Sequence, residues 1–372
     1  MTNLKKEEIK VIAESPYSWE KIKDKTVLIS GGTGFIGTAF IDMLRAVGNS
    51  DLTKLDGKNI FITGGLGLIG SAIVDVLVTY NKIDKVYVGA RSEKEFQVRF
   101  GGCHKVEYVY YDALKKINLD IKPDYIISGA GLASPELYTE KPVETILSNF
   151  DGVHALLDYS KNNRIQRLLY ISSSEVYGNK KTEESFTEGD YGEVDIDNIR
   201  SSYTIAKRAS EMLCKSYASE FGVDCVIVRP GHIYGPSAKK VDKRISSDFA
   251  FRAATVEQLV MKSSGLQKRS YCYSVDCAVQ ILTALLKGKK GQAYNIGHDE
   301  ITTIRQMAKI YAEAGNVKLI IADPTENELK AFNPMSNSSL NNNKIKQLGY
   351  RNSFTVEEGL KHTVCILKEL MG

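Results

Sequence analysis

Short runs of apolar residues alternate with longer amphipathic segments through about the first 230 residues of the chain. Six runs have the length and composition of buried parallel strands, and they span 26–30, 59–63, 85–89, 125–128, 167–172 and 225–229. Helix-length segments with apolar residues on one face separate them. This alternation predicts an α/β fold built on a doubly wound, Rossmann-type parallel sheet.

The pattern changes after Pro236, where polar and less periodic stretches begin. We therefore expect a dinucleotide-binding core at residues 58–236 and a smaller, mainly substrate-binding lobe at 237–372. Residues 1–57 would form a separate N-terminal segment. An Asn- and Ser-rich run at 333–343 is predicted to be a loop.

A repeat lies at the start of the chain. Residues 25–45 recur at 58–78, and ten of the twenty-one aligned positions are identical. Each copy contains a glycine-rich turn, Gly31–Gly37 in the first and Gly64–Gly70 in the second. Two copies are too few to stack into a solenoid. The first copy is therefore predicted to be a duplicated βα unit at the edge of the sheet.

The glycine-rich turns predict a dinucleotide site, because a pyrophosphate needs close backbone approach and the N-terminus of a helix. The second copy is favoured, since a strand end with Arg91 follows it at the distance where ribose is recognised. The predicted cofactor-binding residues of this turn and strand are Gly64, Gly67, Leu68, Ile69, Gly70 and Arg91. An arginine there can accommodate the 2′-phosphate of NADP, so NADP stays open beside NAD.

Tyr203 and Lys207 are spaced to share one face of a helix. A nearby ammonium lowers the pKa of a tyrosine, which would suit Tyr203 to take a proton from a hydroxyl group. Upstream, the apolar run 167–172 leads into Ser173, Ser174 and Glu175. Ligands bind at such strand ends in doubly wound sheets. These residues are therefore candidates for one catalytic site.

The order of glycine turn, serine-rich strand end and Tyr-x-x-x-Lys helix resembles the extended short-chain dehydrogenases that act on nucleotide sugars as epimerases, dehydratases and decarboxylases. Three stretches are most similar to the UDP-glucuronate decarboxylase branch (UDP-xylose synthases). They are Leu132–Pro135 followed by Tyr138, Ser173–Gly178, and Arg200–Arg208 with its Tyr-x-x-x-Lys pair.

The resemblance implies that Ser173, Tyr203 and Lys207 activate a sugar hydroxyl, with Tyr203 and Lys207 also contacting the cofactor. Glu175 would be an acid or base at sugar C5. The implied substrate-binding residues are Ser134, Tyr138, Ser174, Arg200, His232, Arg244 and Arg269. His232 stands where the family often has asparagine, and a neutral histidine also offers a donor and an acceptor. Hydride returned within one cycle regenerates the cofactor, which favours NAD.

Two positions help to distinguish among the decarboxylase, dehydratase and epimerase reactions. Ser174 stands where 4,6-dehydratases carry an aspartate, and simple 4-epimerases usually lack a carboxylate at the position of Glu175. The decarboxylase reaction is therefore favoured, with epimerase and dehydratase left open. The duplicated loop and Arg91 also fit a catalytically silent, cofactor-sensing homologue. The intact set of Ser173, Glu175, Tyr203 and Lys207 argues against that alternative.

Bulk composition limits the partners. Lys and Arg number 49 against 45 Asp and Glu, a surplus of four that favours neither nucleic acid nor an anionic membrane. The six cysteines form no Cys-x-x-Cys pair, so neither a metal site nor a disulfide framework is predicted. The charged N-terminus does not have the apolar stretch expected of a signal peptide, and no apolar run is long enough to span a bilayer. We expect a cytoplasmic homodimer that binds a nucleotide-diphosphate sugar.

Overall fold

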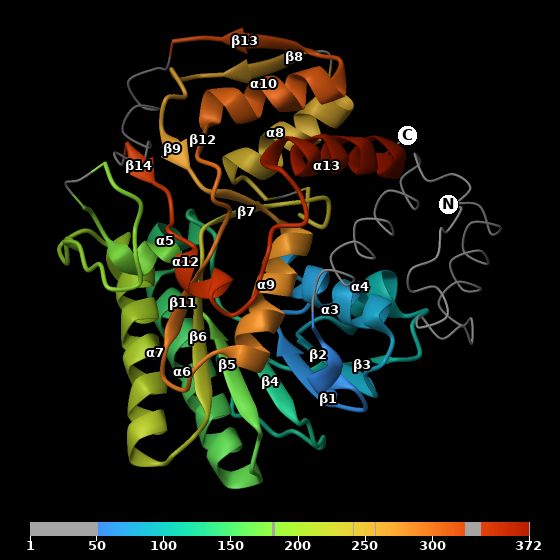
Figure 1. The fold of residues 1–372 in the computed structure, drawn as a ribbon, viewed down its shortest axis with the longest axis vertical. Helices are drawn as coiled ribbons and strands as arrows, with labels where there is room; N and C mark the ends of the chain where they lie inside the picture. Colours follow the sequence, from blue (N-terminus) through green and yellow to red (C-terminus); the bar gives the residue numbers. More distant parts are fainter. Residues whose placement is uncertain (1–50, 181–182, 241, 257, 324–335, 372) are drawn as a thin grey trace.

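The computed structural model describes residues 51–371, apart from 181–182, 241, 257 and 324–335. The first glycine turn, Gly31–Gly37, and the βα unit predicted around it lie outside the described residues. Figure 1 shows a large α/β core with a smaller lobe of helices and short strands at one end of its sheet.

The core is a seven-stranded sheet in the order β11-β6-β5-β4-β1-β2-β3, and every neighbouring pair is parallel. Its strands are β1 (Asn59–Thr63), β2 (Lys85–Ala90), β3 (Val106–Tyr110), β4 (Tyr125–Ser128), β5 (Arg167–Ile171), β6 (Cys225–Pro230) and β11 (Ala293–Ile296). The chain runs outward from β1 to β3 and then returns to the other side of β1 with β4. The predicted doubly wound parallel sheet is confirmed, and its switch point lies between β1 and β4.

Helices cover both faces of the sheet, because side chains alternate along each strand. Ile60 and Ile62 pack on the face covered by α3 and α9, whereas Phe61 packs on the face covered by α6 and α7. The core helices are α3 (Leu68–Tyr80), α4 (Glu93–Phe100), α6 (Pro142–Asn163), α7 (Ser201–Glu220) and α9 (Ser274–Lys287). Among the helices of the described residues, none is long and apolar enough to cross a membrane.

The C-terminal third contributes to both parts of the molecule. Its strand β11 pairs with β6 at the edge of the core sheet, and α9 packs beside α3. The smaller lobe consists of α8 (Ile245–Thr255), β8 (Gln258–Met261), α10 (Ile304–Gly315), β13 (Lys318–Ile321) and α13 (Val356–Met371). Within it, β8 and β13 form a parallel pair and the three helices pack on one another.

The remaining described elements are short. They are η2 (Thr53–Leu55), α5 (Leu137–Glu140), η3 (Ser174–Tyr177), β7 (His232–Tyr234), β9 (Lys268–Arg269), β10 (Tyr271–Tyr273), β12 (Thr302–Thr303), β14 (Asn337–Ser338) and α12 (Asn343–Lys346). The loop predicted at residues 333–343 is wrong in part. Asn337 and Ser338 pair with β9 as strand β14, because β9 supplies backbone partners that the local sequence does not reveal.

Candidate active site

The turn between β1 and α3 leaves no room for a Cβ at Gly64 or Gly70. Gly64 has φ of +74°, and a Cβ there would lie 2.7 Å from the carbonyl oxygen of Gly129. A Cβ on Gly70 would lie 2.3 Å from the carbonyl oxygen of Gly64. Any larger residue at either position would push the turn away from the strand ends.

Gly67 is different, because a Cβ there would meet only the carbonyl oxygen of Gly64, at 3.3 Å. Gly67 is the N-cap of α3 and offers no side chain to cap the helix. The amides of Leu68, Ile69 and Gly70 lack acceptors within the helix, as in any first turn. Open space beside uncapped amides at the positive end of a helix suits the pyrophosphate of a dinucleotide.

Two further residues lie at strand ends beside this turn. The hydroxyl of Thr63 accepts hydrogen bonds of 3.1 Å from the amides of both Gly129 and Ala130, which ties the end of β1 to the end of β4. Sequence reasoning missed Thr63, although a hydroxyl at the end of an apolar strand run was a usable signal. Arg91 lies exposed directly after β2, the strand next to β1.

A second set of side chains lies at the carboxyl end of β5. The hydroxyl of Ser173 accepts a hydrogen bond of 3.2 Å from the amide of Glu175, which starts the short helix η3. Tyr203 and Lys207 lie one turn apart on α7, and both are almost fully buried. A hydrogen bond also links Ser173 to Tyr203. The strand end and the helix therefore present a single group of proton-handling side chains.

Burial governs the titration of this pair. It raises the pKa of Tyr203 to about 12, with the hydrogen bond to Ser173 acting in the opposite direction. It lowers the pKa of Lys207 to about 7, although Glu211 favours the ammonium. The lowered tyrosine pKa expected from the sequence is therefore wrong for the protein alone. The Lys207 ammonium donates to the carbonyl of Ile171 at 2.8 Å and lies 5.7 Å from the centre of the Tyr203 ring.

Aromatic stacking and an ion pair extend the group. The rings of Tyr138 and Tyr203 stack with their centres 4.3 Å apart and their planes 7° from parallel. The guanidinium of Arg200 lies 5.7 Å from the centre of the Tyr138 ring. It also donates to both carboxylate oxygens of Glu175, at 3.2 and 3.3 Å. Two residues separated widely in sequence, Tyr138 and Glu175, are thus joined through Arg200.

A third set comes from the border of the lobe. Burial lowers the pKa of His232 to about 3, and Arg269 and Arg244 act in the same direction, so its ring is neutral at physiological pH. The Nε2 atom of His232 forms a hydrogen bond of 3.0 Å with the hydroxyl of Ser338. Arg244 forms an ion pair with Asp242. Ser338 and Asp242 were not anticipated, because their partners lie far away in sequence or in an irregular segment.

Most of the predicted residues thus form one cluster joined by hydrogen bonds, ring contacts or electrostatic interactions: Tyr138, Ser173, Glu175, Arg200, Tyr203, Lys207, His232, Arg244 and Arg269. Ser134 and Ser174 are half-buried, in the loop after β4 and at the start of η3. The predicted cofactor residues from Gly64 to Gly70 and Arg91 lie instead at the ends of β1 and β2.

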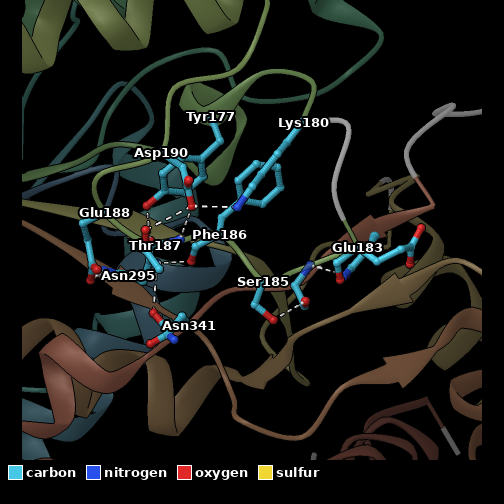
Figure 2. Close-up of polar contacts among 12 residues, drawn as sticks. Tyr177, Lys180, Glu183, Ser185, Phe186, Thr187, Glu188, Asp190, Asn295 and Asn341 are labelled. Carbon is cyan, nitrogen blue, oxygen red and sulfur yellow. Dashed lines mark hydrogen bonds and ion pairs between the residues drawn. The ribbon is translucent and has the colours of Figure 1, made fainter.

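The long loop from η3 to α7 carries Glu175 near its start and Arg200 at its end, and Figure 2 shows how its middle is anchored. Phe186 exchanges backbone hydrogen bonds with Ser339 and Asn341 of the C-terminal segment. The side-chain amide of Asn295, on β11, donates to the carbonyls of Phe186 and Asn341 at 2.9 and 3.0 Å. The middle of the loop is therefore held by both the core sheet and the C-terminal segment.

A buried ion pair fixes α7 itself. The guanidinium of Arg229, on β6, donates to both oxygens of Glu211 at 2.9 and 2.7 Å. Arg229 also donates to the hydroxyl of Tyr177 at 3.2 Å. Removing one partner of such a pair leaves a buried charge, which costs about 3–5 kcal/mol. The charged residue within the apolar run 225–229 was the sequence signal for this pair.

Comparison with known proteins relates this fold and cluster to a group of enzymes. Residues 60–297 match the model of the NAD dependent epimerase/dehydratase family. The chain is 30% identical over 287 residues to UDP-glucuronic acid decarboxylase 6 of Arabidopsis thaliana, which covers 77% of this chain and 73% of that enzyme. It is 27% identical over 251 residues to human dTDP-D-glucose 4,6-dehydratase, covering 65% of this chain and 68% of the dehydratase.

The fold is also similar to that of UDP-glucose 4-epimerase from Thermotoga maritima, whose structure contains UDP-glucose. The TM-score is 0.71 at 24% identity, and the match covers 84% of this chain and 100% of the epimerase. The predicted resemblance to nucleotide-sugar enzymes, with UDP-glucuronic acid decarboxylases among the relatives, is confirmed. The chain therefore belongs to the NAD dependent epimerase/dehydratase family, which confirms the enzyme class and the NAD cofactor predicted from its sequence.

Proposed function

We propose that this protein removes the C5 carboxylate of a nucleotide-diphosphate sugar after oxidation at C4, as in the reaction named for the UDP-glucuronic acid decarboxylases. One observation carries the proposal. The carboxylate of Glu175 belongs to the same cluster as Tyr203, so two proton-handling groups are available for neighbouring carbons. Identity of 30% to a decarboxylase supports the same choice. UDP-glucuronate is the substrate that we propose.

Different side chains act at C4, act at C5 and bind the substrate. Tyr203 takes the proton of the C4 hydroxyl and later returns it, while Ser173 and Lys207 orient and stabilise the phenolate. NAD held on the glycine turn at the end of β1 would supply hydride transfer at C4. A ketone at C4 makes the C5 carboxylate a β-keto acid, whose carbonyl accepts the electron pair when CO₂ leaves. As CO₂ leaves, Glu175 takes up a proton from water and passes it to C5, which carries the electron pair left by the broken bond. Arg244 and Arg269 provide positive charge for the diphosphate, and His232 provides a neutral hydrogen-bonding ring.

We place the cofactor on the second glycine turn, in the core, and the sugar between the core and the smaller lobe. Gly67→Asp should abolish NAD binding, because it puts an anion in the space proposed for the pyrophosphate. The melting temperature should change little, since a Cβ at this position meets only one atom, at 3.3 Å. Calorimetric titration with NAD and with NADP measures the effect and identifies the preferred cofactor.

Two matched variants separate binding from folding. Gly70→Ala should destabilise the fold by about 1–3 kcal/mol, because its Cβ would overlap the backbone of the turn. Gly34→Asp, the equivalent change in the first glycine turn, should leave NAD affinity unchanged. Binding lost in Gly34→Asp and retained in Gly67→Asp would overturn the assignment of the turn.

The substrate is tested with the purified protein, NAD and a panel of nucleotide sugars, with products identified by mass. UDP-glucuronate should release CO₂ and yield a nucleotide pentose. A product of unchanged mass from another sugar would instead identify an epimerase. Loss of water would identify a dehydratase and would contradict the argument from Ser174. If no sugar in the panel is converted, the silent, cofactor-sensing alternative gains support.

We also propose that the protein is a homodimer, formed through the outer faces of α6 and α7, which pack side by side. Exposed apolar side chains line these faces, namely Val143, Ile146, Leu147, Ile205 and Met212. Val143, Ile146 and Leu147 share one face of α6 by their spacing, and Ile205 and Met212 share one face of α7. A second copy can cover these apolar faces in a two-fold symmetric contact.

The double variant Leu147→Asp, Met212→Asp should convert the dimer to a monomer in sedimentation equilibrium. Val98→Asp is the control, because Val98 is equally apolar and 83% exposed but lies on α4. A wild-type protein that sediments as a monomer would contradict the homodimer. A dimer that survives the double variant would place the interface elsewhere.

A further inference from the structure

Arg200 was expected to contact the substrate, but its guanidinium faces Glu175. Nη1 donates to Oε2 at 3.3 Å and Nη2 donates to Oε1 at 3.2 Å, so the two planar groups meet through parallel hydrogen bonds. Such a two-point contact fixes orientation as well as distance. The residues lie 25 positions apart, at opposite ends of the long loop from η3 to α7.

Arg200 also has contacts besides Glu175. Its guanidinium lies 5.7 Å from the centre of the Tyr138 ring, which in turn stacks on Tyr203 at 4.3 Å. The hydroxyl of Ser202 donates to the carbonyl of Tyr138 at 3.0 Å, and the Arg200 amide donates to the side chain of Asn198 at 3.0 Å. Arg200 is thus held both by the Glu175 carboxylate and by the Tyr138 ring, which stacks on Tyr203.

Stability does not explain this arrangement. The side chains of Glu175 and Arg200 keep 32% and 42% of their exposure, and ion pairs of that exposure add little to the free energy of unfolding. Orientation does explain it, because Glu175 has a competing partner. Arg269, on β9, also lies within electrostatic reach of Glu175. Without Arg200, the carboxylate would be drawn towards Arg269 and away from the Tyr138–Tyr203 stack.

We propose that Arg200 is a positioning residue that acts through Glu175, fixing the carboxylate relative to the Tyr203 ring so that the groups serving C4 and C5 form one rigid unit. The proposal rests on the proposed function, because it assigns Glu175 to proton transfer at C5. It replaces the substrate contact expected for Arg200 from the sequence.

A kinetic double-mutant cycle tests this role on whichever nucleotide sugar the wild type converts. The variants are Arg200→Gln, Glu175→Gln and the two combined. Arg200→Gln should lower kcat nearly as far as Glu175→Gln does, while KM stays within about threefold of the wild type. The combined variant should be no slower than Glu175→Gln alone, because residues that act as one unit are not additive. Additive losses would refute the proposal, as would a raised KM with unchanged kcat.

Arg200→Lys refines the result, since it keeps the charge and loses the parallel hydrogen bonds. It should recover only a small part of the kcat lost in Arg200→Gln. Full recovery would show that charge alone is needed and would contradict a positioning role. Arg252→Gln is the control for loss of an exposed arginine that is paired with an aspartate outside the cluster, and it should leave kcat unchanged.

Two measurements do not depend on turnover. UDP affinity, measured by calorimetry, should be the same in Arg200→Gln and wild type, whereas a loss of about tenfold or more would identify a diphosphate ligand. In thermal unfolding, the combined variant should lose less than the sum of the single losses, since each single change already breaks the pair. If no sugar is converted, the proposed function fails, and these two results still decide whether Arg200 acts on Glu175.

Discussion

Tyr203→Phe should lower kcat by about 10²–10⁴, because it removes the group that takes the proton from the C4 hydroxyl. The fold should be retained, since phenylalanine keeps the ring that stacks on Tyr138. NAD affinity should also persist, because the glycine turn at the end of β1 is unchanged. Steady-state rates with the converted nucleotide sugar, together with calorimetric titration of NAD, measure both effects.

The pH dependence identifies the group that is lost. Burial raises the pKa of Tyr203 to about 12, so the phenolate is scarce at neutral pH and its fraction grows as the pH rises. Wild-type kcat/KM should therefore increase with pH. The increase should level off above neutral pH, because Lys207, whose pKa is lowered to about 7, loses its ammonium. Tyr203→Phe should show no such increase.

Tyr191→Phe is the matched control, because Tyr191 is 67% exposed and lies outside the cluster. It should leave both the rate and its pH dependence unchanged. A Tyr203→Phe variant with normal turnover would remove the proposed mechanism, whichever sugar is converted. If Tyr203→Phe is slow, its melting temperature shows whether the loss of rate comes from unfolding.

The fold was predictable where the local pattern of apolar residues shows which side chains are buried. The run 59–63 became β1 with the same bounds, because it is apolar on both faces. Strand β3 was missed because it is an edge strand, in which Glu107 and Tyr110 face solvent and interrupt the apolar run. Strand β11 was missed because it is four residues long and contains Asn295, whose amide is satisfied only by distant carbonyls.

The site was predictable to the extent that its residues belong to motifs. The resemblance identified Tyr203, Lys207 and Glu175 as members of one site, and the structure places them together. The resemblance could not show which residues of the site contact one another, because ring stacking and ion pairing depend on how the connecting loops fold back. The contact of Arg200 with Glu175 bridges 25 residues, and that of His232 with Ser338 bridges 106. The pKa of Tyr203 depends on burial, which the helical spacing of Tyr203 and Lys207 does not reveal.

Glu175→Gln should block product formation while leaving oxidation at C4 intact. Glutamine keeps the shape of the side chain and can still accept a hydrogen bond from Arg200, but it cannot deliver a proton to C5. Tyr203 and Lys207 handle the hydroxyl proton without it. When UDP-glucuronate is added, the near-ultraviolet absorbance of the reduced cofactor should therefore build up on the enzyme and persist, and little nucleotide pentose should appear.

Two variants serve as controls for this result. Tyr203→Phe should show neither the absorbance nor the product, because oxidation at C4 does not begin. Glu220→Gln, an exposed glutamate at the end of α7, should behave like the wild type. If Glu175→Gln forms product at the wild-type rate, C5 receives its proton from another source and Glu175 is not the acid. If it shows no reduced cofactor and no product, Glu175 is needed at or before oxidation, and the division of labour between C4 and C5 is wrong.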